Sequence, residues 1–408
     1  MRYNYPSNMF NLDVYREVKN WKKPVHISRT LAAKHYLKLL PNLDAIAITG
    51  SVGKTLTQNA ISSVLSQKFK TIVGDENLDP TFRIPKTILS AKPWHQKIIL
   101  EFGVERPGDM DHYLSVIIPR IAVVTMISET HLKYLNDING VFNEKVKLIE
   151  VLPKNGTAVL NADDPNVLKM QEKTNARVWL YGENAKDGIK ISHFSQNLNG
   201  SKFRLHYIGQ KASVSWKVVG KHQLLSAYAA ATVGIICGLT LKQIAKGLSL
   251  AKPPSHRLNL IKREKFSLID DTYNASPKAS EESINTLMDL GRGKKKIAVF
   301  GEMKDLGKIS QEEHRALGAK IAKTRLNYLI TVGSAAEEIT RGAKSSGFKG
   351  KLLKVKNTRE ATAEIKKIKD KNPIILVKGS RHAHLERIIQ GLLGKSTLVK
   401  CYHCGTLK

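Results

Sequence analysis

Acidic residues are scarce in this chain of 408 residues. The 35 Asp and Glu residues compare with 66 Lys and Arg residues, which leaves a formal net charge of +31. An excess of this size attracts anions such as nucleotides, phosphorylated sugars, nucleic acid or an anionic membrane. The lysines are spread along the chain, and no basic block is interleaved with aromatic residues as in nucleic-acid-binding modules. We therefore expect no nucleic-acid partner, and the charge otherwise fits a lysine-rich, solvated surface.

Cysteine is also rare, and the three cysteines are Cys237, Cys401 and Cys404. So few thiols exclude a disulfide framework and suit a reducing compartment. Cys401, His403 and Cys404 lie together near the C-terminus and would supply part of a zinc site. A closed zinc site needs four ligands, and no second cysteine pair is present. We interpret this segment as a frayed tail whose role the sequence leaves open.

Long apolar runs are absent as well. No run approaches the ~20 residues that a membrane-spanning helix requires. The N-terminal residues carry charges where a signal peptide would need an apolar stretch. We therefore expect a cytoplasmic protein without stable membrane insertion, and a monomer.

Short apolar runs predict a parallel sheet in the first part of the chain. They follow a polar N-terminal segment, residues 1–43, that contains one helical stretch near Ile27–Leu40. The runs are residues 44–50, 97–103, 120–127, 157–163 and 178–182. Buried parallel strands have this pattern, and their alternation with helix-like segments predicts an α/β domain. We place this central domain, with a mostly parallel sheet, at residues 44–254.

A second series of runs begins after Pro253-Pro254-Ser255. Its expected strands are residues 266–271, 295–303, 328–333 and 374–380. They predict a smaller, Rossmann-like α/β domain at residues 255–395, before a tail at 396–408. Two of its helices should begin at capping residues, Ser310 and Asn357, because a Glu follows each three residues later. Residues 184–219 alternate like strands, and we interpret them as an antiparallel extension of the first domain.

A phosphate site is indicated by Gly50-Ser51-Val-Gly53-Lys54-Thr55, which lies between an expected strand and an expected helix. The glycines allow a tight loop whose N–H groups point at phosphate oxygens, and the helix N-terminus adds positive potential. Lys54 would reach the β- and γ-phosphates, and the Thr55 hydroxyl would bind Mg²⁺. The usual P-loop has four residues between its glycines, whereas two separate them here.

Phosphoryl transfer also needs hard oxygen ligands for a divalent metal. Glu101 ends the run at 97–103, and the run at 120–127 leads into Ser128-Glu-Thr-His131. Both lie at expected C-terminal strand ends, where α/β proteins build their sites. Glu101 and His131 are therefore candidate metal ligands, although strand ends also carry solvated carboxylates.

These motifs resemble the Mur ligase family. GSVGKTLTQ, from Gly50, is similar to the family's GSxGKTTTK, with Leu56 and Gln58 departing from it. Four further segments of the first domain are similar to family motifs: Glu101-Phe-Gly with Pro107-Gly108, Ser128 to Leu132, Asn143-Glu-Lys145-Val-Lys147, and Asn161-Ala-Asp-Asp. The later motifs resemble the branch of the family that adds D-alanyl-D-alanine to a muramoyl peptide. These are Ile269 to Pro277 (IDDTYNASP), Gly301-Glu-Met with Leu306-Gly307 and His314, and Val377 to Arg381 (VKGSR).

The resemblance, which covers about residues 44–392, implies an ATP-dependent carboxylate–amine ligase of the EC 6.3.2 type. Such an enzyme acts in peptidoglycan synthesis and so in cell-wall biogenesis and cell shape. ATP would phosphorylate the carboxylate of a cell-wall precursor, and the amine of an amino acid or dipeptide would attack the acyl phosphate. The expected cofactors are ATP, two Mg²⁺ ions and a carbamylated lysine at Lys145.

The resemblance also implies individual roles. The expected catalytic residues are Lys54, Lys145, His131, Arg257 and Lys378. The expected ATP-binding residues are Gly50, Ser51, Gly53, Lys54, Thr55, Asn161, His222, Arg257, Asp271 and Asn274. The expected metal ligands are Thr55, Glu101, His131 and the carbamate of Lys145. Lys147 is a rival for the carbamylated position, two residues away.

Some positions depart from the family pattern. The segment from Gly220 to Ser226 lacks both Asn residues of GxHNxxNAL, although His222 remains. Only about 43 residues precede the first strand, where relatives usually carry a separate uridine-nucleotide-binding domain. Two alternatives therefore stay open. One is a Mur-like ligase with another acceptor, such as a lipid-linked muropeptide, a pseudomurein-type peptide or a polyamide. The other is a non-catalytic nucleotide-binding scaffold.

Overall fold

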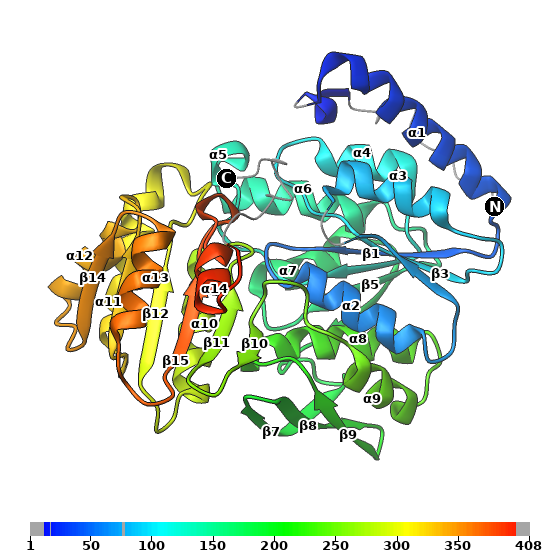
Figure 1. The fold of residues 1–408 in the computed structure, drawn as a ribbon. Coiled ribbons are helices and arrows are strands. Elements are labelled where there is room, and N and C mark those ends of the chain that lie inside the picture. The colour runs from blue at the N-terminus through cyan, green and yellow to red at the C-terminus, as the bar shows by residue number, and fades with distance from the viewer. Residues whose placement is uncertain (1–11, 17, 76–77, 397–408) are drawn as a thin grey trace. The chain divides into compact units, whose positions relative to one another are not determined.

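The computed structural model describes residues 12–16, 18–75 and 78–396, and they form two compact units (Figure 1). The first unit comprises the residues up to Phe194 together with Lys202–Trp216 and Gln223–Lys252. The second comprises Pro253 onward together with Ser195–Ser201 and Lys217–His222. The predicted central domain, residues 44–254, includes Ser195–Ser201 and Lys217–His222, whereas the structure groups these two segments with the second unit. The predicted tail with Cys401 and Cys404 lies outside the described residues. Among the described residues, no helix is long and apolar enough to cross a membrane.

A six-stranded parallel sheet forms the centre of the first unit, in the order β2-β3-β1-β4-β5-β6. Its strands are β1 (Asp44–Thr49), β2 (Thr71–Val73), β3 (Lys97–Glu101), β4 (Ile121–Val124), β5 (Thr157–Asn161) and β6 (Arg177–Tyr181). The central strands are buried along almost their whole length. Continuous apolar runs are what strands covered on both faces require.

Helices cover both faces of this sheet (Figure 1). One face carries α2 (Lys54–Leu65), α8 (Leu224–Ile236) and α9 (Leu241–Leu250). The other carries α3 (Pro80–Ser90), α4 (Asp109–Val116), α6 (Ile138–Glu150) and α7 (Pro165–Lys169), whose apolar side chains share a core with the sheet. The remaining elements are η1 (Leu12–Tyr15), η2 (Asn20–Lys22), α1 (Lys23–Tyr36), η3 (Leu37–Leu39), α5 (Leu132–Leu135), η4 (Met170–Lys173) and η5 (Lys221–Gln223).

The alternating stretch at 184–219 forms strands as predicted, but they build a separate sheet. This sheet contains β7 (Lys190–Asn197), β8 (Gly200–Tyr207) and β9 (Gln210–Trp216) in that order. The connections between them are two residues long, and such short connections join only antiparallel strands. The extension is therefore not a continuation of the parallel sheet.

The second unit contains a six-stranded sheet in the order β10-β11-β15-β12-β13-β14. Its strands are β10 (Asn259–Lys262), β11 (Ser267–Asp271), β12 (Lys296–Phe300), β13 (Tyr328–Val332), β14 (Lys351–Val355) and β15 (Ile374–Lys378). All neighbours are parallel except β10, which pairs antiparallel with β11. This topology and the parallel sheet of the first unit confirm the predicted α/β class.

Alternate residues of the second sheet enter two separate cores. Ile269 and Ala298 pack towards one core, whereas their neighbours Leu268 and Ile297 pack towards the other, as the two-residue period of a strand requires. The helices are η6 (Gly307–Ile309), α10 (Pro277–Leu290), α11 (Ser310–Ala322), α12 (Glu337–Ser345), α13 (Thr358–Lys367), η7 (Arg381–Ala383) and α14 (Glu386–Leu392).

One of the two predicted caps is present. Asn357 precedes α13, and its side chain accepts a hydrogen bond from the Glu360 N–H at 2.9 Å. The cap at Ser310 is wrong, because Ser310 is already the first residue of α11 and Ile309 occupies the cap position without a side-chain hydrogen bond. The preceding turn η6 continues directly into α11, so the backbone at Ser310 is already helical.

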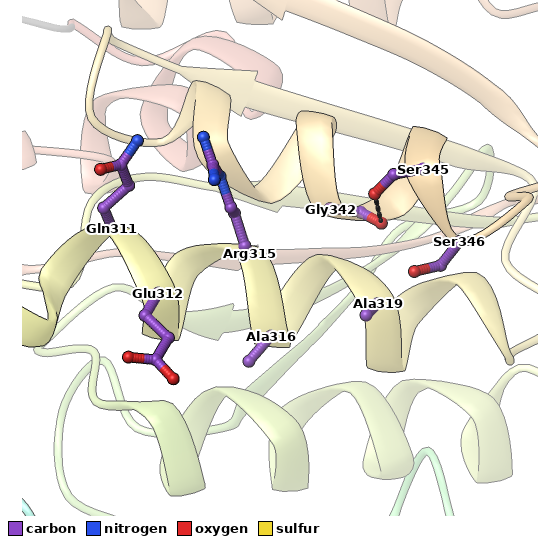
Figure 2. Close-up of a pocket in the computed structure, with 8 residues that line it drawn as sticks. All are labelled: Gln311, Glu312, Arg315, Ala316, Ala319, Gly342, Ser345 and Ser346. Carbon is purple, nitrogen blue, oxygen red and sulfur yellow. Dashed lines mark hydrogen bonds between the residues drawn. The ribbon is translucent and has the colours of Figure 1, made fainter.

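Helices α11 and α12 pack unusually closely because glycines lie at their contact. A Cβ atom on Gly342 would lie 2.1 Å from the Arg315 carbonyl oxygen. The Gly318 position is equally close to the Ile339 carbonyl. Figure 2 shows the shallow pocket beside this contact, about 410 Å³ in volume.

Candidate active site

The loop from Gly50 to Gly53 joins β1 to α2 in the first unit. Gly50 and Gly53 adopt φ angles of 140° and 88°, which residues with a Cβ atom rarely adopt. A Cβ atom on Gly50 would lie 1.9 Å from Thr125 Oγ1. Gly53 is the cap residue of α2 and offers no side chain to its N-terminal N–H groups. These N–H groups and the helix dipole are therefore available to an anion.

The end of β4 holds this loop in place. Thr125 Oγ1 donates a hydrogen bond to the Val52 carbonyl at 2.7 Å. The Ser51 N–H donates to the Met126 carbonyl at 2.7 Å, and the Ser51 hydroxyl donates to the Ser128 carbonyl at 3.0 Å. The sequence analysis missed Thr125, since a threonine at the end of an apolar run has no distinguishing local pattern.

Lys54 and Thr55 occupy the first turn of α2. The Lys54 ammonium donates to the carbonyls of Gly50 at 2.9 Å and Ser51 at 3.3 Å, so it folds over its own loop. The Thr55 hydroxyl donates to Glu101 Oε2 at 3.0 Å. Two of the predicted metal ligands, on α2 and at the end of β3, are thus in direct contact. Together they present the hard oxygen atoms that Mg²⁺ prefers.

A buried arginine, which the sequence analysis did not single out, also contacts Glu101. Arg83 on α3 is only 3% exposed, and its Nη2 lies 3.4 Å from Glu101 Oε2. The same nitrogen donates to the Glu101 backbone carbonyl at 3.3 Å. In sequence, Arg83 looks like a polar residue on the outer side of a helix. Only the packing of α3 against β3 brings it to the carboxylate.

Lys145 on α6 is almost completely buried, with 1% of its surface exposed. Among the described residues its ammonium group makes no hydrogen bond or ion pair. Burial holds the pKa of Lys145 well below its ordinary value, and the Lys54 charge lowers it further. Nearby carboxylates oppose this shift without reversing it. A lysine in this state carries a neutral, nucleophilic amine at lower pH than a surface lysine does.

His131 lies at the N-terminus of α5 in a left-handed conformation, with φ of 57°. Burial lowers the pKa of His131 to about 3, and the charges of Lys54 and Lys145 act in the same direction. The imidazole is therefore neutral near pH 7, which is the form that binds metals.

Lys147 has a different environment from Lys145 although the two are close in sequence. Its ammonium donates to Asp111 at 2.6 Å and to Glu144 at 2.8 Å. Burial alone would lower the pKa of Lys147, but the hydrogen bonds to Asp111 and Glu144 outweigh burial and raise it. Glu144 also accepts from the N–H groups of Gly108 and Met110 at the start of α4. Lys147 is thus a charged residue in an ion-pair network that joins α6 to α4.

Asn161 at the end of β5 uses its side chain within the protein. Its amide donates to the Thr125 carbonyl at 2.7 Å, and its side-chain oxygen accepts from the Asp163 N–H at 2.9 Å. These bonds connect β5 to the segment that supports the phosphate loop.

In the second unit, Asp271 at the end of β11 joins several predicted site residues. Its Oδ2 accepts hydrogen bonds from Lys378 Nζ and Ser283 Oγ, both at 2.6 Å. Lys378, at the end of β15, is 2% exposed and also donates to the Asn274 carbonyl at 2.9 Å. Because β11 and β15 are parallel neighbours with Asp271 opposite Lys378, the sheet itself sets this contact.

Arg257 lies beside the same strand end. Its guanidinium group stacks over the Tyr273 ring at 4.0 Å, and that of Arg381 lies 5.1 Å from the same ring. The neighbours of Arg257 are strained, since His256 and Leu258 have φ angles of 57° and 51°. His256 Nδ1 contacts Asp270 Oδ2 at 2.8 Å, which anchors this turn to β11.

His222 lies in η5 near α10. Its Nδ1 is 3.6 Å from Glu282 Oε2, too far for a hydrogen bond. Burial lowers the pKa of His222 to about 4, although Glu282 and Asp271 oppose the shift. It is therefore a neutral ring on the second unit near pH 7.

Among the described residues, no three His, Cys, Asp or Glu side chains gather into a closed metal site. The contact that the structure shows between two predicted metal ligands is the hydrogen bond from Thr55 to Glu101.

Comparison with known proteins identifies the family. The Mur ligase middle domain matches residues 48–234, and the Mur ligase glutamate ligase domain matches residues 256–381. UDP-N-acetylmuramoyl-tripeptide–D-alanyl-D-alanine ligase of Bacillus subtilis (strain 168) is 30% identical over 365 residues, which are 88% of this chain and 78% of that protein. The chain belongs to the Mur ligase family. The resemblance seen in the sequence is thus confirmed.

Solved Mur ligases share the fold. MurF from Acinetobacter baumannii is 26% identical and superimposes with a TM-score of 0.83, covering 91% of this chain and 81% of that one. MurF ligase from Thermotoga maritima, solved in complex with ADP, gives a TM-score of 0.80 at 24% identity, covering 91% and 84%. The predicted enzyme class, an ATP-dependent peptide ligase, is confirmed by this family membership.

Proposed function

We propose that this Mur ligase adds D-alanyl-D-alanine to a UDP-N-acetylmuramoyl-tripeptide, with hydrolysis of ATP, in peptidoglycan synthesis. The relative from Bacillus subtilis is named for this reaction, and the chain covers 78% of its length. The observation that carries the proposal is the pair of contacts at the glycine loop, from Lys54 to the Gly50 carbonyl and from Thr55 to Glu101. The buried Lys145 lies close enough for the Lys54 charge to lower its pKa.

The reaction follows from the chemistry of carboxylates. A free carboxylate is a poor acyl donor, so the γ-phosphoryl group of ATP is first transferred to its oxygen to give an acyl phosphate and ADP. The neutral amine of D-alanyl-D-alanine then attacks the acyl carbon, the tetrahedral intermediate loses inorganic phosphate, and the nitrogen loses a proton. Positioned positive charge around the phosphoryl group is the main requirement.

The first unit supplies that charge in this proposal. The loop with Gly50, Ser51 and Gly53 presents the N-terminus of α2 to the phosphates, while the Ser51 N–H stays bonded to the Met126 carbonyl, and Lys54 moves from its loop carbonyls to the transferring group. Thr55 and Glu101 would hold one Mg²⁺ ion, with His131 and a carbamate on Lys145 at a second. When bound, these ions neutralise the negative charge that develops on the phosphoryl oxygens.

The carbamate requires the neutral amine of Lys145. Its nitrogen attacks CO₂ and releases one proton, which turns the neutral amine into a carbamate whose single negative charge is shared by two oxygens. The lowered pKa of Lys145 favours this step, and the absence of a hydrogen-bond partner among the described residues leaves the amine available for it. For the second unit, we propose that Arg257, Asp271, Asn274 and His222 are nucleotide-binding residues and that Lys378, with Arg257, is a catalytic residue.

The test is a direct assay with ATP, Mg²⁺, UDP-N-acetylmuramoyl-tripeptide and D-alanyl-D-alanine, followed by mass spectrometry. We expect the mass of the UDP-N-acetylmuramoyl-pentapeptide and one ADP for each amide formed. Release of phosphate that does not depend on either substrate, without a new amide, would contradict the proposal.

A further inference from the structure

The outward side of the N-terminal helical segment carries several large apolar side chains. Trp21 is 70% exposed, Val25 53%, Leu31 44% and Leu39 72%. Pro24, Ser28, Ala32 and His35 are also exposed and fill the positions between them. These residues recur every three or four positions, so they form one stripe along η2, α1 and η3. We call this set of eight residues the α1 stripe.

The opposite side of the same helix is fixed to the first unit. Thr30 and Ala33 are buried, and the helix packs mainly on α3, with further contacts to α4. Tyr15, 1% exposed, donates or accepts a 2.7 Å hydrogen bond with Thr30 Oγ1 and stacks near His26. The helix therefore has a defined orientation in the unit, and the exposed residues of the α1 stripe lie on the side of the helix away from the buried Thr30 and Ala33.

Basic residues accompany the stripe on both sides. Residues 18–43 contain Lys19, Lys22, Lys23, Arg29, Lys34 and Lys38 and no Asp or Glu. At 100° per residue, Lys22 and Arg29 lie on one flank of the stripe and Lys38 on the other. An apolar stripe between basic flanks is the pattern of helices that lie in the plane of a membrane surface.

We propose that the α1 stripe docks on the surface of an anionic lipid bilayer. Trp21 and the aliphatic side chains enter the boundary between headgroups and acyl chains, and the flanking lysines and arginine contact anionic headgroups. The charge is complementary, since Lys22, Arg29 and Lys38 flank the stripe, residues 18–43 contain no Asp or Glu, and the whole chain carries +31. The helix lies on the membrane and does not cross it, in keeping with the lack of a spanning helix among the described residues.

The experiment is co-sedimentation of the full chain with vesicles at physiological salt. Vesicles of equal parts phosphatidylcholine and phosphatidylglycerol are compared with vesicles of phosphatidylcholine alone. Binding should occur only to the anionic vesicles. Val25→Glu and Leu39→Glu should each weaken vesicle binding about tenfold. In each variant a carboxylate replaces an apolar group that would enter the bilayer, and the carboxylate repels the anionic headgroups.

Ile208→Glu is the matched control, since Ile208 is 80% exposed but lies between β8 and β9, far from α1 in the sequence. It makes the same change of an exposed apolar residue to Glu and should bind as the native chain does. Ligase activity on soluble substrates should be unchanged in all three variants, which shows that they are folded.

Three outcomes would overturn the proposal. One is no binding to anionic vesicles. Another is equal weakening by Val25→Glu and Ile208→Glu, which would mean that the overall charge, not the α1 stripe, is responsible. The third is evidence that protein covers the stripe in place of lipid. Such evidence would be concentration-dependent self-association that Val25→Glu abolishes, or vesicle binding that appears only after deletion of residues 1–11.

Discussion

At the scale of single residues, Lys54 is the residue of the glycine loop whose charge the proposed phosphoryl transfer most requires. Its ammonium contacts two carbonyls of the loop, and in the proposed reaction it leaves them for the phosphates. Lys54→Ala should lower the ligase rate on the order of 10³-fold or more, because the phosphoryl charge loses its partner. The exposed Lys86→Ala is the control and should leave kcat unchanged. A near-native rate for Lys54→Ala would remove the loop from the reaction.

Two lysines on α6 provide a second test at this scale. Lys145→Ala should abolish ligation, and short carboxylic acids should restore part of it by supplying oxygen ligands in place of the carbamate. Lys147→Ala should retain turnover and show no such rescue. It should lose about 1–2 kcal/mol of unfolding free energy, because Glu144 loses a charged hydrogen-bond partner. If short carboxylic acids restored activity to Lys147→Ala and not to Lys145→Ala, the carbamate would have to be assigned to Lys147 instead of Lys145.

His222 allows a prediction for pH. Its pKa is lowered from 6.5 to about 4 by burial, so between these values the unfolded chain binds a proton that the folded chain does not. The free energy of unfolding should therefore fall as the pH decreases through this window, and this contribution should be constant above it. Chemical denaturation at several pH values should show a shallower pH dependence for His222→Gln than for the exposed control His35→Gln. Identical slopes would contradict the prediction.

At the scale of elements, helix packing in the second unit depends on Gly342. A glycine-to-alanine change inside a helix normally stabilises it by about 1 kcal/mol. Here the new Cβ would lie 2.1 Å from the Arg315 carbonyl oxygen, so α11 and α12 would have to separate. We expect Gly342→Ala to lower the free energy of unfolding by about 1–3 kcal/mol. Lys344→Ala, an exposed change on the same helix, should be neutral in the same denaturation experiment.

At the scale of the whole molecule, nucleotide binding should couple to stability. A ligand that binds only the folded chain stabilises it by about 2.7 kcal/mol at a concentration of one hundred times its Kd. Saturating MgATP should therefore raise the melting temperature of the native chain. Lys54→Ala should show a much smaller rise at the same concentration, while its melting temperature without nucleotide stays close to native. Equal rises in both would place the nucleotide elsewhere.

Sequence alone determined the class of fold and the phosphate loop. The apolar run at 97–103 contains strand β3 (Lys97–Glu101), because a short apolar run is typical of a strand covered on both faces. Gly50, Gly53, Lys54 and Thr55 are recognisable, although the spacing of the glycines departs from the usual P-loop, because they lie between an apolar strand and a helix. The Asn357 cap was also predictable, since its hydrogen bond to Glu360 spans three residues.

Tertiary structure alone decided which lysine has a lowered pKa and what contacts Glu101. Lys145 and Lys147 look alike in sequence, but only Lys147 reaches Asp111, 36 residues away, whereas Lys145 is buried without an ion-pair partner among the described residues. Arg83 reaches Glu101 through the packing of α3 on β3, and no local pattern encodes that contact. Charge state and coordination depend on neighbours distant along the chain, so they are properties of the folded unit.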